Sequence, residues 1–140
     1  MRRVSLPMLL FALACGLPGC TVDSAPLIAK DVVIMKPTPD AQMGAGYLAL
    51  TNTTDQAITI SKVTSPEFAS VEMHQSYLED GISRMRPLAT VTIPPDSMIV
   101  FERGAKHLML MGPTASASNI TLQFYADDAL ILSVNAPIEE

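Results

Sequence analysis

Alternation of apolar and polar side chains is the main pattern along this chain from residue 28 onward. In the segment 57–63, for example, Ile58 and Ile60 alternate with polar residues, which is typical of a strand with one buried face. No segment shows the period of an amphipathic helix. The predicted strands are 28–36, 47–51, 57–63, 70–78, 82–88, 91–93, 98–102, 107–111, 120–125 and 130–134.

Proline, glycine and aspartate separate these predicted strands. Pro37-Thr38-Pro39-Asp40 ends the first one, and Glu79-Asp80-Gly81 joins two alternating segments as a hairpin turn would. One helical turn is allowed for in 65–69. The pattern predicts an all-β, antiparallel domain, built as a sandwich or a small barrel.

The segment 1–20 resembles an export signal. Its start, Met1-Arg2-Arg3, is positively charged, and the apolar run 6–14 is too short to span a bilayer. Leu17-Pro18-Gly19-Cys20 resembles a lipobox, in which Cys20 would be lipidated, whereas Ala12-Leu13-Ala14 before Cys15 offers a rival cleavage site. We predict export to the periplasm, either as a lipoprotein anchored at Cys20 or as a soluble protein after simple cleavage.

The predicted boundaries are a signal or lipobox-like segment 1–20, a tether 21–27 and a single domain 28–140. Both cysteines lie in the first segment. We therefore expect no disulfide, no thiolate metal site and no cysteine nucleophile in the folded domain.

The domain is acidic. The chain has 9 basic residues, of which Arg2 and Arg3 lie in the signal segment, and 14 acidic residues, all of which follow that segment. The remainder therefore carries a net charge of −7 and has no basic cluster, which disfavours nucleic-acid binding. Membrane association is expected only through the lipid anchor.

The chain has two histidines, and each has a methionine at a spacing that strands can bring together. His107 and Met109 lie two residues apart in one predicted strand, so their side chains point to the same face. His74 and Met85 lie on the two arms of the predicted hairpin, where antiparallel pairing brings them roughly opposite each other. The sequence thus predicts two pairs of imidazole and thioether.

Imidazole and thioether together suit a soft, monovalent metal ion. Ca²⁺ and Mg²⁺ require oxygen ligands, and zinc prefers imidazole, carboxylate and thiolate. Methionine suits Cu(I), and its weak bonds can be replaced one at a time by an incoming ligand. We predict that one Cu(I) ion is bound by His74, Met85, His107 and Met109, and that the protein is a metal carrier.

The spacing of these four residues, H-x10-M-x21-H-x-M, resembles the signature of the PCuAC family of periplasmic copper chaperones. Neighbouring segments are similar too, including Ala45-Gly46-Tyr47, Val71-Glu72-Met73-His74 and Met85-Arg86-Pro87. The resemblance covers about residues 28–135, which is nearly all of the predicted domain.

This resemblance implies a cupredoxin-like Greek-key β-barrel that binds Cu(I) near its surface. It also implies delivery of copper to an acceptor, such as subunit II of cytochrome c oxidase or another copper chaperone, or a wider role in periplasmic copper homeostasis. Met111 shares a face with Met109 and is a candidate auxiliary ligand. Met73 is a second auxiliary candidate, although it would reach the site only if a β-bulge turned it.

Three other classes of function fit the sequence less well. An electron-transfer cupredoxin needs a cysteine thiolate beside its histidines, and the domain has no cysteine. An enzyme is not expected, because the sequence shows no nucleophile–base arrangement and no phosphate-binding glycine loop. A metal-free, immunoglobulin-like interaction domain of an exported lipoprotein agrees with the strands but leaves the histidine–methionine pairs unexplained.

Overall fold

The computed structural model describes residues 25–37, 40–114 and 116–139. The predicted signal segment, with Cys15 and Cys20, lies outside these residues. Among the described residues, no helix is long and apolar enough to cross a membrane. The strands are β1 (Leu27–Met35), β2 (Met43–Asn52), β3 (Ile58–Ile60), β4 (Lys62–Thr64), β5 (Phe68–Glu79), β6 (Ile82–Pro87), β7 (Val91–Ile93), β8 (Met98–Phe101), β9 (Lys106–Pro113), β10 (Asn119–Ala126) and β11 (Ala129–Glu139).

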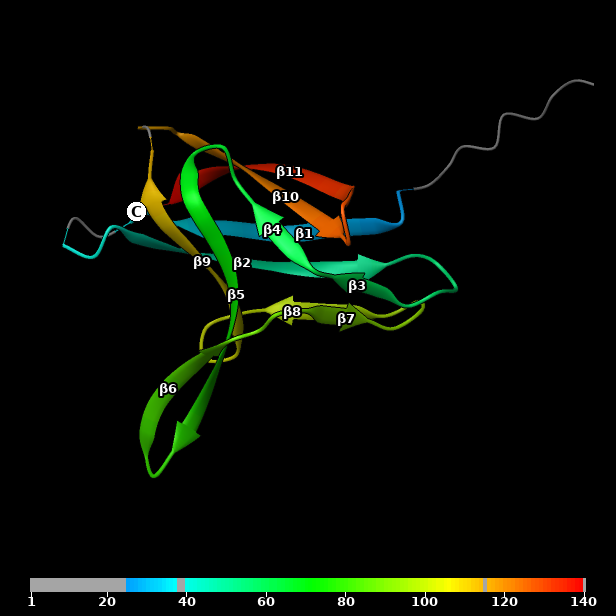
Figure 1. The fold of residues 1–140 in the computed structure, drawn as a ribbon, viewed down its shortest axis with the longest axis horizontal. Coiled ribbons are helices and arrows are strands. Elements are labelled where there is room, and N and C mark those ends of the chain that lie inside the picture. Colours follow the sequence, from blue (N-terminus) through cyan, green and yellow to red (C-terminus); the bar gives the residue numbers. More distant parts are fainter. Residues whose placement is uncertain (1–24, 38–39, 115, 140) are drawn as a thin grey trace, which may run out of the picture.

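Seven strands close into a barrel. Their order is β1-β11-β10-β4-β5-β9-β2, and pairing of β2 with β1 completes the circle (Figure 1). The all-β barrel expected from the sequence is confirmed. The pairing is not wholly antiparallel, however, because β1 runs parallel to the end of β11 through Ile34↔Ile138 and Met35↔Glu139.

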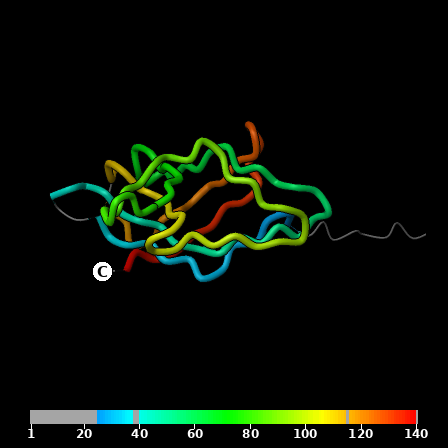
Figure 2. The backbone as a smooth tube through the Cα atoms, turned by 90° about the horizontal axis from the view of Figure 1, so that it is seen from below, coloured from blue at the N-terminus to red at the C-terminus, as the bar shows by residue number. Residues whose placement is uncertain are grey.

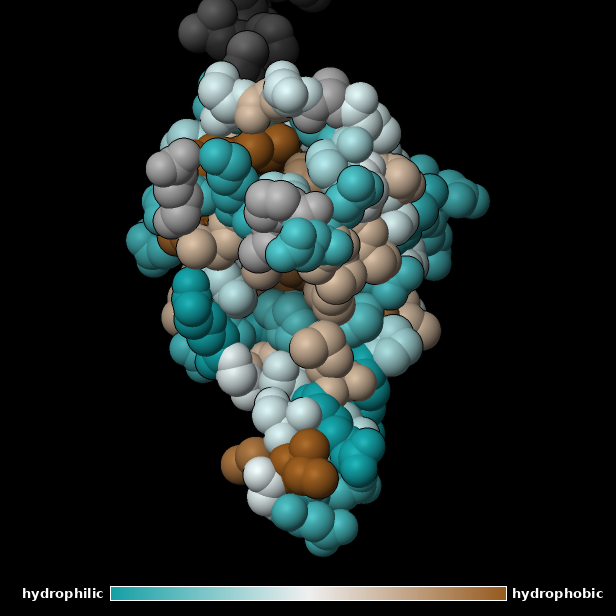
Figure 3. All heavy atoms as spheres, turned by 90° about the vertical axis from the view of Figure 1, so that its left-hand side faces the viewer, coloured by the Kyte–Doolittle hydropathy of each residue, from teal (hydrophilic) through white to brown (hydrophobic). Residues whose placement is uncertain are grey.

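The remaining strands extend the barrel. β8 pairs with the second half of β2, and β3 and β7 form a separate two-stranded sheet. β6 pairs only with β5, and together they form a hairpin that projects from the body (Figures 1 and 3). Figure 2 shows the chain of β7 and β8 running along the length of the body, on the side from which the hairpin leaves it.

The apolar positions of the alternating pattern fill the barrel interior. Leu108 lies between His107 and Met109 in the sequence, and Leu110 follows Met109. Both leucines are completely buried, as the sequence predicts. Each such side chain contributes about 1.5–3 kcal/mol relative to an exposed position. The other fully enclosed side chains include Phe101, Phe124, Leu27, Ile34, Leu48, Leu50, Ile60, Ile93, Ile120 and Leu122. Because the core holds these alternate residues, the residues between them lie on the outer face.

Three local predictions differ from the structure. The single strand expected at 57–63 is divided at Ser61, whose backbone N–H donates to the carbonyl of Tyr125, so that β3 and β4 join different sheets. The helical turn allowed for in 65–69 is instead a tight turn before Phe68. The first strand begins at Leu27, which is buried, one residue before the predicted start of the domain; residues 21–24 of the predicted tether lie outside the described residues.

Candidate metal centre

The two histidines lie directly opposite each other on neighbouring strands. In the pairing of β5 with β9, His74 faces His107, Met73 faces Leu108 and Glu72 faces Met109. Directly opposed residues of an antiparallel pair share a face, so both imidazoles are on the side away from the core. Their ring centroids are 5.9 Å apart, with an angle of 47° between the ring planes.

One nitrogen of His107 is held by the backbone. Its Nδ1 lies 3.1 Å from the carbonyl oxygen of Ala105, which also accepts a hydrogen bond from the backbone N–H of Ser76. An Nδ1–H that donates to this carbonyl leaves Nε2 as the lone-pair nitrogen. His107 is only 8% exposed, so the strand ladder and this hydrogen bond together fix its orientation.

The arrangement at His74 is the reverse. Its Nε2 lies 2.9 Å from a carboxylate oxygen of Glu72, which accepts the Nε2–H, and its Nδ1 is buried without any hydrogen-bond partner. A buried nitrogen with a free lone pair is costly unless something binds it. A metal ion is such a ligand, and a carboxylate behind a metal-binding imidazole is a frequent arrangement. The donor set therefore fits a metal ion.

The two methionines of the predicted set lie on the same outer face. Met109 follows His107 by two residues on β9, as predicted. Met85 is opposite Ser76 rather than His74, because the turn consists of Asp80 and Gly81 alone, both with positive φ. The sequence placed His74 and Met85 roughly opposite each other, and the observed pairing differs from direct opposition by two residues. They lie two residues apart diagonally, which is within reach of a long side chain.

A hollow of about 380 Å³ joins these side chains. It is lined by His107, Met109 and Met85, together with Arg103. The guanidinium of Arg103 lies 5.7 Å from the ring centre of Tyr47. Figure 1 shows the base of the projecting hairpin, where β5 leaves the barrel next to β9. His74, which is opposite His107 on the neighbouring strand, is not among the residues that line the hollow.

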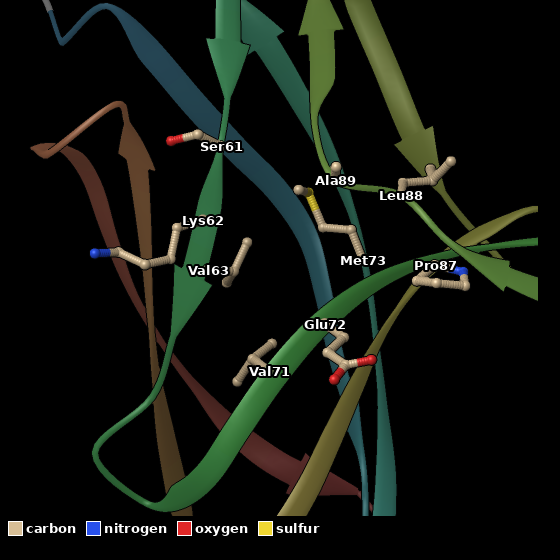
Figure 4. A pocket seen from close by; sticks show the side chains of 9 residues that line it. All are labelled: Ser61, Lys62, Val63, Val71, Glu72, Met73, Pro87, Leu88 and Ala89. Carbon is tan, nitrogen blue, oxygen red and sulfur yellow. The ribbon is translucent and has the colours of Figure 1, made fainter.

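The structure separates the two auxiliary candidates. Met111 lies on the outer face of β9, opposite Met43 of β2, and so stays a candidate ligand. Met73 is 4% exposed and points to the other side of β5, where it lines a small apolar hollow with Val63 and Leu88 (Figure 4). The expected condition for Met73 to be a ligand was a β-bulge, and β5 has none at this position. Met73 is therefore a core residue and no longer a candidate ligand.

The imidazole and thioether donors of this set suit a soft metal ion. Among the residues that the structure describes, no group of three or more His, Cys, Asp or Glu side chains could hold a metal ion. A site for zinc or calcium built from those residues is thus missing from the described ranges. Two imidazoles and two thioethers are the donors that favour Cu(I).

Comparison with known families decides the identity. The model of the family described as "Putative lipoprotein LpqE-like" matches residues 27–138, which is most of the chain. The chain belongs to this LpqE-like family. No curated protein matches the sequence.

Solved PCuAC domains share the fold of this LpqE-like protein. The copper-bound PCuAC domain from PmoF2 has 18% sequence identity and a TM-score of 0.63, over 81% of this chain and 92% of that one. Apo-DR1885 from Deinococcus radiodurans has 22% identity and a TM-score of 0.60, over 100% of this chain and 95% of that one. The Cu(I) form of DR1885 has 23% identity and a TM-score of 0.56, over 86% and 81%. The PCuAC resemblance and the barrel predicted from the sequence are confirmed.

Several residues of this LpqE-like protein that border the centre were not predicted. They are Glu72, Arg103, Met35 and Met43, to which the sequence analysis assigned no role at the site. Their positions follow from pairing between distant strands. The one available signal was the spacing of Glu72 and His74, which places both on one face of a strand.

Proposed function

We propose that this LpqE-like protein is an exported carrier of Cu(I). The ion, which is cargo rather than a resident cofactor, would be bound by His74, His107, Met85 and Met109. The observation that carries the proposal is the pair of opposed imidazoles, of which His74 holds a buried Nδ1 with no hydrogen-bond partner. The copper named in the descriptions of PmoF2 and DR1885 agrees with this assignment.

The exposure of the four side chains suits transfer. His107 is buried, whereas Met85 is 54% exposed on the projecting hairpin. The ligands of an acceptor can reach Met85 first and replace its thioether before they reach the imidazoles. Thioether bonds are individually weak, so this stepwise exchange needs no change in the oxidation state of copper.

The acceptor and the location are further parts of the proposal. We expect delivery to a periplasmic copper protein, either the cytochrome c oxidase copper centre or another copper chaperone. The lipoprotein description of the family supports export and a lipid anchor, for which Cys20 is the candidate residue. Mass measurement of the mature protein from membranes would identify the modified residue.

A competition titration tests the metal site. Purified protein is titrated anaerobically with Cu(I) against a Cu(I) chelator, beside Met109→Leu and His107→Ala. We expect both substitutions to weaken binding by at least about tenfold. Met98→Leu, an exposed methionine on β8 away from the site, is the matched control and should bind as the natural chain does. Unchanged affinity for Cu(I) in both site variants would refute the proposal that these residues carry the ion.

A further inference from the structure

Methionines gather on one face of the sheet beyond the predicted site. The described residues contain seven methionines. Met73 is in the core and Met98 is on β8, but the other five share the outer face that carries the two histidines. These five are Met35, Met43, Met85, Met109 and Met111.

The strand register explains how Met35 can approach Met109. Met35 on β1 is opposite Ala45 on β2, and Ala45 is in turn opposite Met109 on β9. The three residues thus form a row across adjacent strands, which are spaced about 4.8 Å apart. Ala45 is small, so it leaves space above it into which the two long side chains can extend.

Met43 completes the group from the end of the same hollow. Met35, Met43 and Met109 all line the cavity that also contains His107, and Met43 is 41% exposed. Gly44 and Ala45 also line this cavity. Three flexible thioethers therefore surround a space that is open to solvent and continuous with the imidazole of His107.

The surroundings restrict what could bind there. Among the described residues that line this cavity there is no carboxylate, and the basic ones are Lys36 and Arg103. Arg103 also lies 3.8 Å from the sulfur of Met35 and would have to move for a metal ion to bind there. The positive charge of Arg103 opposes a divalent cation twice as strongly as a monovalent one. Neutral sulfur donors under these conditions select a soft, singly charged ion and bind it weakly.

We propose that Met35, Met43 and Met109 form a second, weaker position for Cu(I), next to the site of His74 and His107. This inference rests on the proposed function, and it adds a route by which the ion enters or leaves. Met109 belongs to both positions. As the ion moves inward, the thioethers of Met35 and Met43 are replaced by imidazole nitrogens, and copper stays monovalent throughout.

The test uses silver ion as a probe, because Ag(I) is a soft monovalent ion that does not change oxidation state. Protein labelled with carbon-13 at the methionine methyl groups is titrated with Ag(I) and followed by NMR. We expect the first equivalent to shift the methyl signals of Met85 and Met109, and further Ag(I) to shift those of Met35 and Met43. The signal of Met98 should stay in place.

A double variant gives the second arm of the test. Met35→Leu with Met43→Leu should lose the later phase and keep the shifts of the first equivalent, whereas Met98→Leu should keep both phases. The second position is overturned if the signals of Met35 and Met43 do not move while that of Met109 does, or if the double variant titrates as the natural chain does. If the first equivalent of Ag(I) shifts the methyl signals of neither Met85 nor Met109, the proposed function itself fails.

Discussion

At the residue scale, the two imidazoles present different nitrogen atoms to the centre. Nδ1 of His107 donates a hydrogen bond to the backbone carbonyl of Ala105, and Nε2 of His74 donates one to the carboxylate of Glu72. The free nitrogens are therefore Nε2 of His107 and Nδ1 of His74. Each hydrogen bond selects one tautomer before any ion binds, which reduces the cost of organising the ligands.

Replacing Glu72 tests whether its carboxylate selects the tautomer of His74. In Glu72→Gln the amide oxygen is a weaker acceptor than the carboxylate, so we expect a mixture of tautomers at His74 and about tenfold weaker Cu(I) binding. Nitrogen-15 NMR of the imidazoles in the metal-free protein measures the tautomer directly. Glu79→Gln, on the hairpin and paired with Arg84, is the control. A His74 spectrum identical to that of the natural chain would show that Glu72 has no positioning role.

At the element scale, β2 is the strand that brings the parts of the centre together. Its first half pairs with β1 on one side and with β9 on the other, so it sits between Met35 and Met109. Close approach of the strands requires small residues here. A Cβ at Gly44 would lie 2.7 Å from the carbonyl oxygen of Met35, and one at Gly46 would lie 3.2 Å from Cβ of Leu108.

Gly44→Ala should therefore destabilise the barrel. The clash is with backbone, which cannot rotate away as a side chain can, so β1 and β2 must separate. We expect a loss of about 1–3 kcal/mol in the free energy of unfolding, as for other overpacked positions. Urea denaturation measures it. An unchanged unfolding midpoint would mean that the two strands are farther apart than the structure indicates.

Glu67 ties the turn before β5 to β10. Burial acts to raise the pKa of this carboxyl, but hydrogen bonds from the hydroxyl of Ser65 and the backbone N–H of Thr121 outweigh it, so the pKa is lowered overall. A lowered pKa in the folded state means that the ionised group stabilises the fold. This stability is present above the ordinary pKa of glutamate and is lost as the pH falls through the lowered value.

Glu67→Gln removes that pH dependence. At neutral pH we expect the variant to be less stable by about 1 kcal/mol, because a charge-assisted hydrogen bond becomes a neutral one. The difference from the natural chain should shrink as the pH falls below the ordinary pKa of glutamate. Unfolding curves recorded at several acidic pH values measure it. A difference that stays constant through this range would contradict the assignment.

At the scale of the whole molecule, a compact barrel carries one projecting arm. Every residue of β6 is exposed, and Leu78 and Ile82 near the turn are 77% and 57% exposed. Figure 3 shows apolar side chains near the end of this arm. Within the described residues β6 has no partner strand besides β5, so the hairpin is less stable than the barrel.

Amide hydrogen exchange should report this difference. Without metal, we expect the amides of β6 to exchange faster than those of β9, which is paired on both sides. Binding of Ag(I) through Met85 should slow exchange in β6, because the ion ties the arm to the barrel. In Met85→Leu this slowing should be absent while exchange without metal is unchanged. Equal protection of β6 and β9 without metal would contradict the picture of a loosely held arm.

The fold class and the ligand face of β9 could be read from local pattern. Alternation places Leu108 and Leu110 inside and leaves His107 and Met109 outside, because side chains along any strand alternate with a period of two. The Asp80-Gly81 turn likewise predicts its hairpin, since both residues tolerate positive φ. These conclusions need only neighbours in the chain.

The pairing of strands that are distant in sequence could not be read in this way. The register of β5 on β9, which opposes His74 to His107, depends on how the whole barrel packs. So does the row from Met35 through Ala45 to Met109. The position of Met85 opposite Ser76 rather than His74 is set instead by the two-residue turn of the hairpin. Local alternation assigns each donor to a face, but closure of the barrel around a shared core brings the faces of separate strands together.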